Sequence, residues 1–493
     1  MMKRLLALVL CLCFALGGCA QNVQHTEEGG GVMPVPNQPE QPAAASFEPL
    51  ALRLAALPEL PPEPDESALW DALNALDHDK LGDEKYNEEY QKLWDAHSAQ
   101  QTAYYDAVQA LRGVGVDTAL TSALTAYTLR TAKQLFSGAA EENVVYSPAN
   151  LYLALCMLAE TTDGESRAQV LDLLGLSSVE QARGAANALW RNLYRDSATG
   201  RTLLANSLWL NEQFDYHEDA VDTLAQDYYA STFRAAMGDS ATDEAIHAWI
   251  NENTNGLLKD AAASLETKPE TLMMLISTLY FKGTWADQFE PFNTREDTFT
   301  AANGAEQKLD FMHIVKNGNY YRGEGFTVAA LPFMGGTSMW FLLPDEGAAP
   351  DVDKLFSDLT QYRISDAELS GFGIESGYGE IHWSVPKFDV DSSLDLIPQL
   401  QALGVTDVFD DRADFSPLTD LDALVSAVTH AARVKVDEEG CEAAAFTAIM
   451  AEATAAMPEQ LPVVEMDLDR PFGFLITGVD GLPLFTGLVN TLE

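Results

Sequence analysis

The chain has 493 residues and a formal net charge of −46, with a pI near 4.2. Its hydrophobic content of 47% is typical of a folded protein, and its length is enough for two or three ordinary domains. Because so acidic a surface repels phosphate groups, the composition argues against nucleic-acid binding and against adsorption to anionic lipid headgroups.

The first nineteen residues have the pattern of a secretory signal. Lys3 and Arg4 precede an apolar run that is too short to span a bilayer as a helix, and the run ends in Leu16-Gly17-Gly18-Cys19. This ending resembles a bacterial lipobox, in which Cys19 carries the lipid and begins the mature protein. An ordinary signal peptide with a chance cysteine is the alternative. We expect a secreted, lipid-anchored protein on the extracellular face of a bacterial cell membrane.

Two segments separate this leader from the main domain. Residues 20–66 are rich in Pro, Gly, Glu and Ala, which predicts an acidic tether without a packed core. Residues 67–113 carry apolar side chains at helical spacing, first at Leu69, Ala72 and Leu76 and again from Tyr90 onward. They predict a helical spacer or hairpin made of two or three helices. Binding of a surface partner by this segment is a second possibility.

From residue 116 to residue 493 the pattern is α+β. A helix is predicted from near Leu120 to Phe136, and a short strand and a Ser-Pro helix start follow at Asn143. Buried strands, two late hairpins and a helix over 393–404 then alternate without a βαβ rhythm. These later segments, in chain order, are TLLANSLWLN, HAWINENTNGLL, LMMLISTLYFKGTW, VAALPFM, SMWFLLP, IHWSVPKFDVDSS, SLDLIPQLQALG, LVSAVTHAARVKVDEEG, FGFLITG and LPLFTGLV.

Motifs of the common enzyme classes are absent from the sequence. There is no GxSxG, HExxH or P-loop, no GxGxxG in a strand-to-helix turn, and no Cys/His spacing of a zinc site. We therefore expect neither an enzyme nor a cofactor or metal. The sequence leaves open whether Cys156 and Cys441, the two cysteines outside the leader, form a disulfide.

Several motifs, in collinear order, resemble those of the serpin family. Asn143 to Pro148 resembles its NxxxSP segment, and Tyr280 to Trp285 resembles its YFKGxW. Pro386-Lys387-Phe388, Thr429 to Ala432 and Arg470-Pro471-Phe472 resemble three further family strands. The residues that resemble the family hinge, EEGTEAAA, are Glu438, Glu439, Gly440, Cys441, Glu442, Ala443, Ala444 and Ala445. The chain is thus identified as a member of the serpins.

The resemblance implies a serpin fold with three β-sheets, eight or nine helices and an exposed reactive-centre loop. In this family a protease cuts the loop, and the freed segment enters the central sheet as a new strand and carries the acylated protease with it. The segment after Gly440 suits this role, because every second residue from Cys441 to Ala453 is uncharged. Glu442 and Glu452 fall on the other, wet face, so no carboxylate would be buried. A flexible Ala-rich loop of a non-inhibitory serpin is the alternative.

The resemblance also implies two polar sites beneath the loop. Ser147 and His430 match the serine and histidine of the family's shutter, whereas Ser277 stands in place of its usual Asn and Asn150 in place of its second Ser. Trp285 matches the tryptophan of the breach, where insertion begins. The residue pattern alone would make His430 and Trp285 core residues. A Ser147/His430 hydrolase is the least favoured alternative, because no third catalytic member or oxyanion motif accompanies the pair.

Counting forward from Glu438 by the family spacing places the reactive bond at Thr454-Ala455, within two residues either way, and Ala453-Thr454 and Ala455-Ala456 are the nearest rivals. Counting back from Pro471 disagrees, because the segment from Ala455 to Arg470 is longer than usual. Small residues at the bond indicate an elastase-like or subtilisin-like serine protease as partner, and trypsin-like enzymes are excluded because no Lys or Arg lies between Gly440 and Asp469. We expect a monomer without a heparin-like activator. A chaperone, binding protein or adhesin that uses residues 67–112 remains an alternative function.

Overall fold

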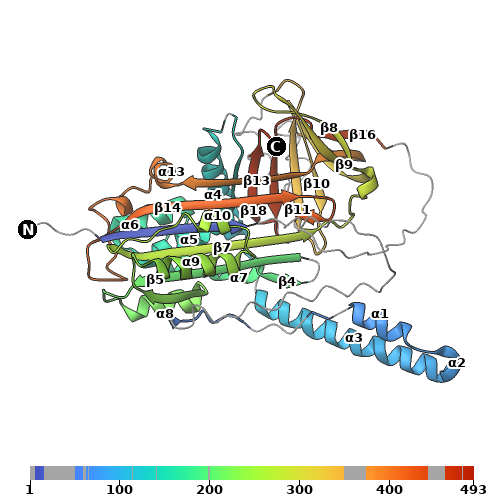
Figure 1. The fold of residues 1–493 in the computed structure, drawn as a ribbon, viewed down its shortest axis with the longest axis horizontal. Helices are drawn as coiled ribbons and strands as arrows, with labels where there is room; N and C mark the ends of the chain where they lie inside the picture. Colours follow the sequence, from blue (N-terminus) through green and yellow to red (C-terminus); the bar gives the residue numbers. More distant parts are fainter. Residues whose placement is uncertain are drawn as a thin grey trace, which may run out of the picture.

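The computed structural model describes residues 6–15, 50–58, 63–64, 66–113, 115–139, 141–197, 200–348, 374–441, 461–479 and 481–492. Within them, strands and helices alternate in an α+β architecture, and the strands form two sheets of nine strands each. The long strands of the first sheet run across the molecule in Figure 1, and the second sheet lies at one end of them.

The first sheet is the central one. Its strands are ordered β13, β14, β1 with β15, β7, β5, β6 and β2 across the sheet, and β4 pairs with one end of β5. Their bounds are β1 (Leu6–Ala15), β2 (Ala51–Arg53), β4 (Arg195–Ser197), β5 (Gly200–Asn211), β6 (Ala230–Ala235), β7 (Thr271–Thr284), β13 (Phe388–Asp395), β14 (Ala423–Val436) and β15 (Gly440–Cys441).

The second sheet has two halves that share the long strand β9. One half joins β16, β12 and β8 to β9, and the other continues from β9 through β10, β11, β17 and β18 to β3. Together with the central sheet these two halves give the three-part strand arrangement expected from the sequence. The bounds are β3 (Val144–Tyr146), β8 (Arg295–Thr300), β9 (Glu306–Gly323), β10 (Phe326–Pro332), β11 (Ser338–Pro344), β12 (Glu375–Pro386), β16 (Val463–Asp467), β17 (Phe472–Thr477) and β18 (Pro483–Val489).

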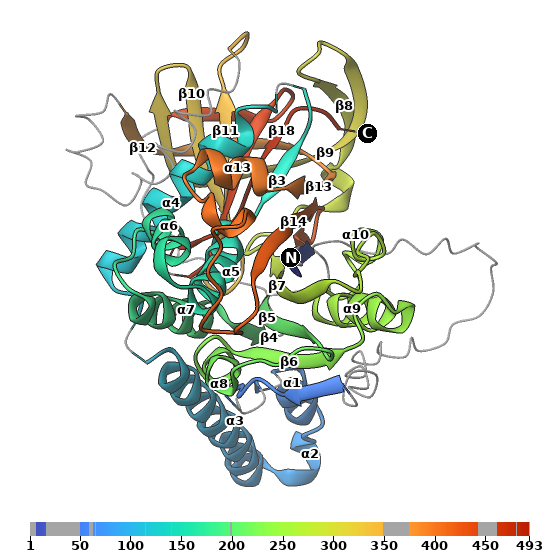
Figure 2. The same cartoon turned by 90° about the vertical axis from the view of Figure 1, so that its left-hand side faces the viewer.

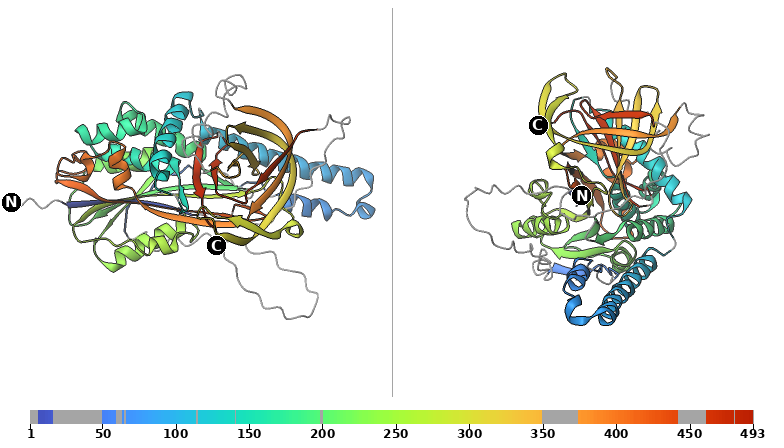
Figure 3. Two further views of the ribbon diagram at one scale, coloured as in Figure 1. Left: turned by 90° about the horizontal axis from the view of Figure 1, so that it is seen from above. Right: turned by 90° about the vertical axis from the view of Figure 1, so that its right-hand side faces the viewer.

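Eight α-helices of the described chain belong to this domain, and they cover both faces of the central sheet. Figure 3 shows α9 and α10 on one face and α5, α6 and α7 on the other. The bounds are α4 (Thr118–Phe136), α5 (Pro148–Thr161), α6 (Gly164–Leu174), α7 (Val179–Leu193), α8 (Glu218–Asp227), α9 (Ser240–Asn253), α10 (Lys259–Ala262) and α13 (Ile397–Ala402), with 3-10 turns at η3 (Pro291–Asn293) and η4 (Asp407–Phe409). None of the described helices is long and apolar enough to cross a bilayer.

The strand β7 and the helix α5 behind it are buried because most of their side chains on every side are apolar. In β7, Lys282 alone is partly exposed, and all fourteen residues of α5 are buried. Helix α5 starts where it does because the Ser147 hydroxyl oxygen accepts from the Asn150 amide and Pro148 occupies its first turn. The start of α5 is thereby fixed beneath β7 and β14.

The expected helix over 393–404 begins later than the sequence predicts. Strand β13 runs on to Asp395, whose backbone pairs with Thr429 of β14, so α13 starts only at Ile397. The pairing with a long neighbouring strand outweighs the local helix propensity of the Ser-Leu-Asp segment.

The segment before the main domain forms a helical hairpin, α1 (Glu66–Asn74), α2 (His78–Leu81) and α3 (Asp83–Arg112). Helix α3 is continuous over thirty residues, and Trp70 of α1 meets Trp94 of α3 edge to face at 5.9 Å between ring centroids. The Arg191 guanidinium of α7 donates to the carbonyl oxygens of Ala110, at 3.1 Å, and Leu111 at the end of α3. Figure 2 shows the hairpin on the far side of the central sheet from the second sheet.

The leader contributes a strand to the central sheet. Residues 1–19 have the sequence of a signal, and their removal stays a prediction. In the structure, β1 runs between β14 and β7 and parallel to both. The pairing extends from Leu6 opposite Ala423 to Ala15 opposite Tyr280.

Candidate functional site

The four residues expected in the shutter meet at one point behind the central sheet. Ser147 and Asn150 come from the start of α5, Ser277 from the middle of β7 and His430 from the middle of β14. None of the four side chains is more than 1% exposed. The structure therefore brings together residues that lie up to 283 positions apart in the sequence.

Hydrogen bonds connect α5 to β7 and β7 to β5 at this point. The Asn150 side-chain amide donates to the Ser277 carbonyl oxygen at 3.1 Å, and the Ser277 hydroxyl lies within donating reach of the side-chain oxygens of Asn150 and Asn206, the latter at 2.7 Å. A hydroxyl has one proton, so it serves one of these two oxygens at a time. Asn206 in turn donates to the Tyr228 carbonyl oxygen at 2.8 Å. The amide and hydroxyl that have changed places relative to the family pattern still contact each other.

Asn206 is a member of this network that the sequence analysis missed. It faces Ser277 in the β5–β7 register and is 2% exposed. A signal was present, because Asn206 and Ser207 interrupt the apolar run TLLANSLWLN. A polar side chain in a strand predicted to be buried needs a buried partner, and that requirement could have identified it.

Ser147 and His430 are connected through the backbone. The Ser147 amide donates to Nε2 of His430 at 3.1 Å, while the Ser147 hydroxyl oxygen accepts from the Asn150 amide at 3.4 Å. Burial lowers the pKa of His430 to about 3, so the imidazole is neutral and its Nε2 is an acceptor. These bonds give the pair a structural role at the junction of α5 and β14 and do not align it as nucleophile and base.

Trp285, expected at the breach, lies at the end of β7 against the start of the loop. Its indole N–H donates to the Asp437 carbonyl oxygen at 2.9 Å, and its backbone amide donates to the Glu439 carbonyl oxygen at 3.0 Å. The ring stacks on Phe333 at 4.3 Å and is 1% exposed. Trp285 is therefore both a core residue and the residue that holds the turn from β14 into the hinge.

The first hinge residue, Glu438, is held by an ion pair that the sequence analysis did not predict. Its carboxylate lies 3.0 Å from Nζ of Lys387 and accepts from the Thr294 hydroxyl at 2.9 Å. Burial acts to raise the pKa of Glu438, but the hydrogen bonds from Lys387, its own backbone amide and Thr294 outweigh burial and leave the pKa below its ordinary value. Glu438 is thus ionised at neutral pH and fixes the hinge to Lys387, the residue between β12 and β13.

The next hinge residues have already entered the central sheet. Gly440 and Cys441 form β15, in which Cys441 pairs with Val436 of β14 on one side and with Gly283 of β7 on the other. Gly440 has φ 153°, and a Cβ at this position would lie 2.1 Å from the Gly283 carbonyl oxygen. Only glycine fits here, so the close approach of the hinge to β7 requires it.

The remaining predicted site residues fall outside the described residues. These are the hinge residues Glu442, Ala443, Ala444 and Ala445, the reactive bond Thr454-Ala455 and the lipidation residue Cys19. Cys156 and Cys441 are described, and both are buried without a disulfide between them. The pairing of these two cysteines that the sequence left open is therefore not formed in the structure.

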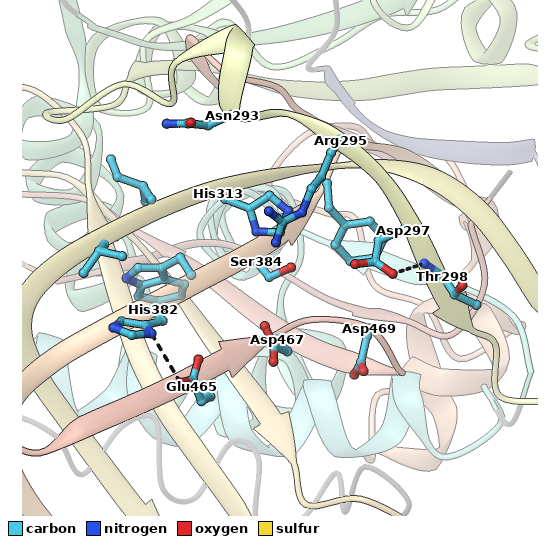
Figure 4. A pocket seen from close by; sticks show the side chains of 14 residues that line it. Asn293, Arg295, Asp297, Thr298, His313, His382, Ser384, Glu465, Asp467 and Asp469 are labelled. Carbon is cyan, nitrogen blue, oxygen red and sulfur yellow. Dashed lines mark hydrogen bonds and ion pairs between the residues drawn. The ribbon is translucent and has the colours of Figure 1, made fainter.

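A cavity of about 530 Å³ lies on the half of the second sheet formed by β8, β9, β12 and β16. Figure 4 shows Arg295 and His313 on one side of it and Asp467 and Asp469 on the other. Burial raises the pKa of Asp467, and the neighbouring carboxylates Glu465 and Asp469 add to the rise. Basic side chains and the carboxylates of Asp and Glu both line the cavity, so the lining selects neither anionic nor cationic ligands.

One residue of the cavity wall, His382, also holds β16, the first described strand after the loop, against β12. His382 of β12 contacts Glu380 through Nε2 at 2.9 Å and Glu465 of β16 through Nδ1 at 3.2 Å. The hydrogen bond to Glu380 and the charge of Glu465 raise the pKa of His382. In the described part of the chain, no cluster of three or more His, Cys, Asp or Glu could hold a metal ion.

Comparison with known proteins agrees with this geometry. The family model described as Serpin (serine protease inhibitor) matches residues 122–492. Iris from Ixodes ricinus is 31% identical over 360 residues, which cover 71% of this chain and 92% of Iris. An uncharacterized serpin-like protein from Methanosarcina acetivorans is 29% identical over 72% of this chain and 82% of its own length. The crystal structure of the thermophilic serpin tengpin in the native state superposes with a TM-score of 0.66 at 29% identity and covers 77% of this chain and 95% of tengpin.

Proposed function

The chain belongs to the serpin family, and we propose that it is a lipid-anchored inhibitor that traps serine proteases by inserting its cleaved loop into the central sheet. Members of this family are in general protease inhibitors and not catalysts. In the proposed reaction the protease serine attacks the Thr454 carbonyl carbon, the Thr454–Ala455 bond breaks, and the amine of Ala455 leaves. The loop then inserts while Thr454 is still esterified to the protease.

One observation carries this proposal. The hinge turns back at Glu438 and places Gly440 and Cys441 between β7 and β14, with backbone pairing on both sides. Further insertion would continue β15 between β7 and β14, in the antiparallel direction that pairs well with both neighbours. The family resemblance supplies the rest of the mechanism, since reactive-loop insertion is an established case of strand addition to a sheet.

The proposed target is an elastase-like or subtilisin-like protease. Thr454 and Ala455 are small and suit a shallow specificity pocket, and they come from a forward count along the sequence. No heparin-like activator is proposed. In the structure the two arginines of α7 are already engaged, Arg183 by Glu160 at 2.8 Å and Arg191 by the end of α3.

The proposed location is the outer face of a bacterial membrane, through lipid on Cys19. The matched pair for this test is the wild-type chain and Cys19→Ser. Wild type should incorporate labelled palmitate and sediment with membranes, and the variant should appear in the medium. A variant that stays in the membrane fraction, together with unlabelled wild type, would overturn the anchor.

The inhibitory function is tested by incubating residues 20–493 with a panel of serine proteases. A complex that resists SDS should form with elastase-like or subtilisin-like enzymes, and the released C-terminal peptide should begin at or near Ala455 by mass spectrometry. Ala445→Glu should bury a carboxylate on insertion and turn the inhibitor into a substrate, whereas Ala444→Glu, on the wet face, should inhibit as wild type does. Equal inhibition by both variants contradicts the face assignment, and preferred inhibition of trypsin contradicts the proposed bond.

The melting temperature of the cleaved chain, measured after the same incubation, distinguishes an inhibitory from a non-inhibitory serpin. Cleavage of an inserting loop should raise the melting temperature, because backbone groups become paired and an apolar face becomes buried. A chain that is cleaved without forming a complex and without a rise in melting temperature is a binding, chaperone or adhesin-type protein.

A further inference from the structure

The leader strand β1 lies in the gap that the loop must enter. Along β14 it pairs from Leu6 opposite Ala423 to Cys13 opposite Ala431, and along β7 from Ala7 opposite Thr271 to Ala15 opposite Tyr280. Its backbone donors and acceptors therefore use the inner edges of both strands. An edge group that is already paired is not available to a second strand.

The hinge enters the same gap from the opposite end. Cys441 pairs with Gly283 of β7, and Ala15 pairs with Tyr280, so two residues of β7 separate the two segments. β15 is antiparallel to β7 and β14, whereas β1 is parallel to them, and the two segments point toward each other along one line. A loop that inserts beyond Cys441 would need the positions that β1 holds.

The sequence of the leader suits a strand with neighbours on both sides. The ten residues LALVLCLCFA contain no charge, proline or glycine. A strand inside a covered sheet is apolar on both faces, and helix α5 packs behind this one. At about 3.3 Å per residue the segment spans roughly 33 Å, which fills most of the gap.

We propose that the uncleaved leader occupies the insertion gap and blocks loop insertion, and that its removal converts the chain into an active inhibitor. This rests on the proposed function above, in which the chain is cut before Cys19 and the loop inserts. A parallel strand pairs slightly less well per residue than an antiparallel one. The leader therefore holds the gap because it is covalently joined to the rest of the chain. Once the chain is cut before Cys19, the loop replaces the leader.

The test compares three chains made in the cytosol. The first is the full chain with Cys19→Ser, which prevents lipidation, and the second is the chain from residue 20. The third is the full chain with Cys19→Ser, Leu8→Pro and Leu10→Pro, which keeps the length of the leader but removes its ability to pair. Hydrogen exchange is followed at Thr271–Tyr280 and Ala423–Ala431. These amides should exchange at least tenfold more slowly in the full chain than in the other two.

The three chains are then mixed with an elastase-like protease. The full chain should be cleaved without an SDS-resistant complex, and the leaderless and proline chains should form one. Equal exchange in all three chains overturns the occupancy of the gap, whatever the inhibition assay gives. Slower exchange with full inhibition by the uncleaved chain overturns the block. An exchange difference without a complex from any chain leaves the occupancy supported and contradicts the inhibitory function itself.

Discussion

The Glu438 carboxylate and the Lys387 ammonium lie 3.0 Å apart and join the first residue of the hinge to the residue between β12 and β13. The backbone of Glu438 accepts from the Phe289 amide at 3.1 Å, so the same residue is also tied to the segment after β7. The hinge is thus fixed on both sides of the point where the loop enters the sheet.

Glu438→Gln should lower the free energy of unfolding by about 1 kcal/mol at pH 7. The figure is modest because Lys387 is 38% exposed and its charge is screened by water. Because the folded-state pKa of Glu438 is lowered, the stabilisation is present above the unfolded pKa near 4.3 and is lost as the pH falls through the folded pKa. Denaturant unfolding at pH 7 and pH 3.5 measures both effects.

Asp389→Asn is the matched control for Glu438→Gln. Asp389 of β13 pairs with Arg433 of β14 at 2.7 Å, and this nearby ion pair includes no hinge residue. Asp389→Asn should leave the rate of loop insertion without cleavage unchanged. Glu438→Gln should accelerate this insertion, which is measured as conversion to a higher-melting form. Identical conversion rates for the two variants would show that the ion pair does not restrain the hinge.

Ser277→Ala should destabilise the domain by roughly 1–3 kcal/mol, because the buried side-chain oxygens of Asn150 and Asn206 lose their donor. The combination Ser277→Ala/Asn206→Leu should cost less than the sum of its parts, since the Asn206 oxygen, one of the two acceptors that Ser277→Ala leaves without a donor, is then absent. Urea unfolding of the four chains of this cycle gives the coupling energy. A coupling energy of zero would mean that the Ser277–Asn206 contact contributes nothing.

His430 should stay neutral in the folded protein down to about pH 3. The unfolded chain binds a proton on this histidine below about pH 6.5, so its contribution favours unfolding increasingly as the pH falls, by about 1.4 kcal/mol per unit. The imidazole resonances of His430 should therefore not titrate between pH 8 and pH 5. His430→Asn should have a shallower acid slope of stability than wild type.

The fastening of β16 should weaken as the pH rises. The raised pKa of His382 means that its bridge to Glu380 and Glu465 is fully present below the unfolded pKa near 6.5 and is lost as the pH rises through the folded value. Amide protection of Val463–Asp467, corrected for the intrinsic rate, should fall between pH 6 and pH 8.5. Glu465→Gln should remove most of this dependence, and Glu380→Gln should shift it to lower pH.

Much of the site could be predicted from the sequence because its residues lie in motifs that keep their order along the chain. Ser147, Ser277, His430 and Trp285 were located in this way, and the structure brings the first three together and sets Trp285 against the hinge. The alternation of uncharged residues after Gly440 can be read without the family resemblance, because alternation along a strand is a local property of the sequence. Most of these residues lie outside the described part of the chain, so the assignment of the buried and wet faces stays a prediction.

The partners of these residues could not be predicted, because they depend on which strands become neighbours. Asn206 joins the network only because β5 and β7 pair with Asn206 opposite Ser277. Lys387 was recognised as part of a motif, but its role follows from the distance to Glu438, which no spacing encodes. The pairing of the leader with β14 and β7 is equally remote in sequence, and its apolar run fits a signal peptide as well as a central strand.

The short strand β2 affects how readily the protein associates with other copies of itself. It pairs with β6, the outer strand of the central sheet, through Ala51 opposite Phe233 and Arg53 opposite Thr232. It is only three residues long, and Arg53 carries a charge that is paired with Asp222. A long bare edge invites strands from other molecules, whereas a short charged one offers them little to extend. The segment that leads from the tether into the domain thus also protects the protein from edge-to-edge aggregation.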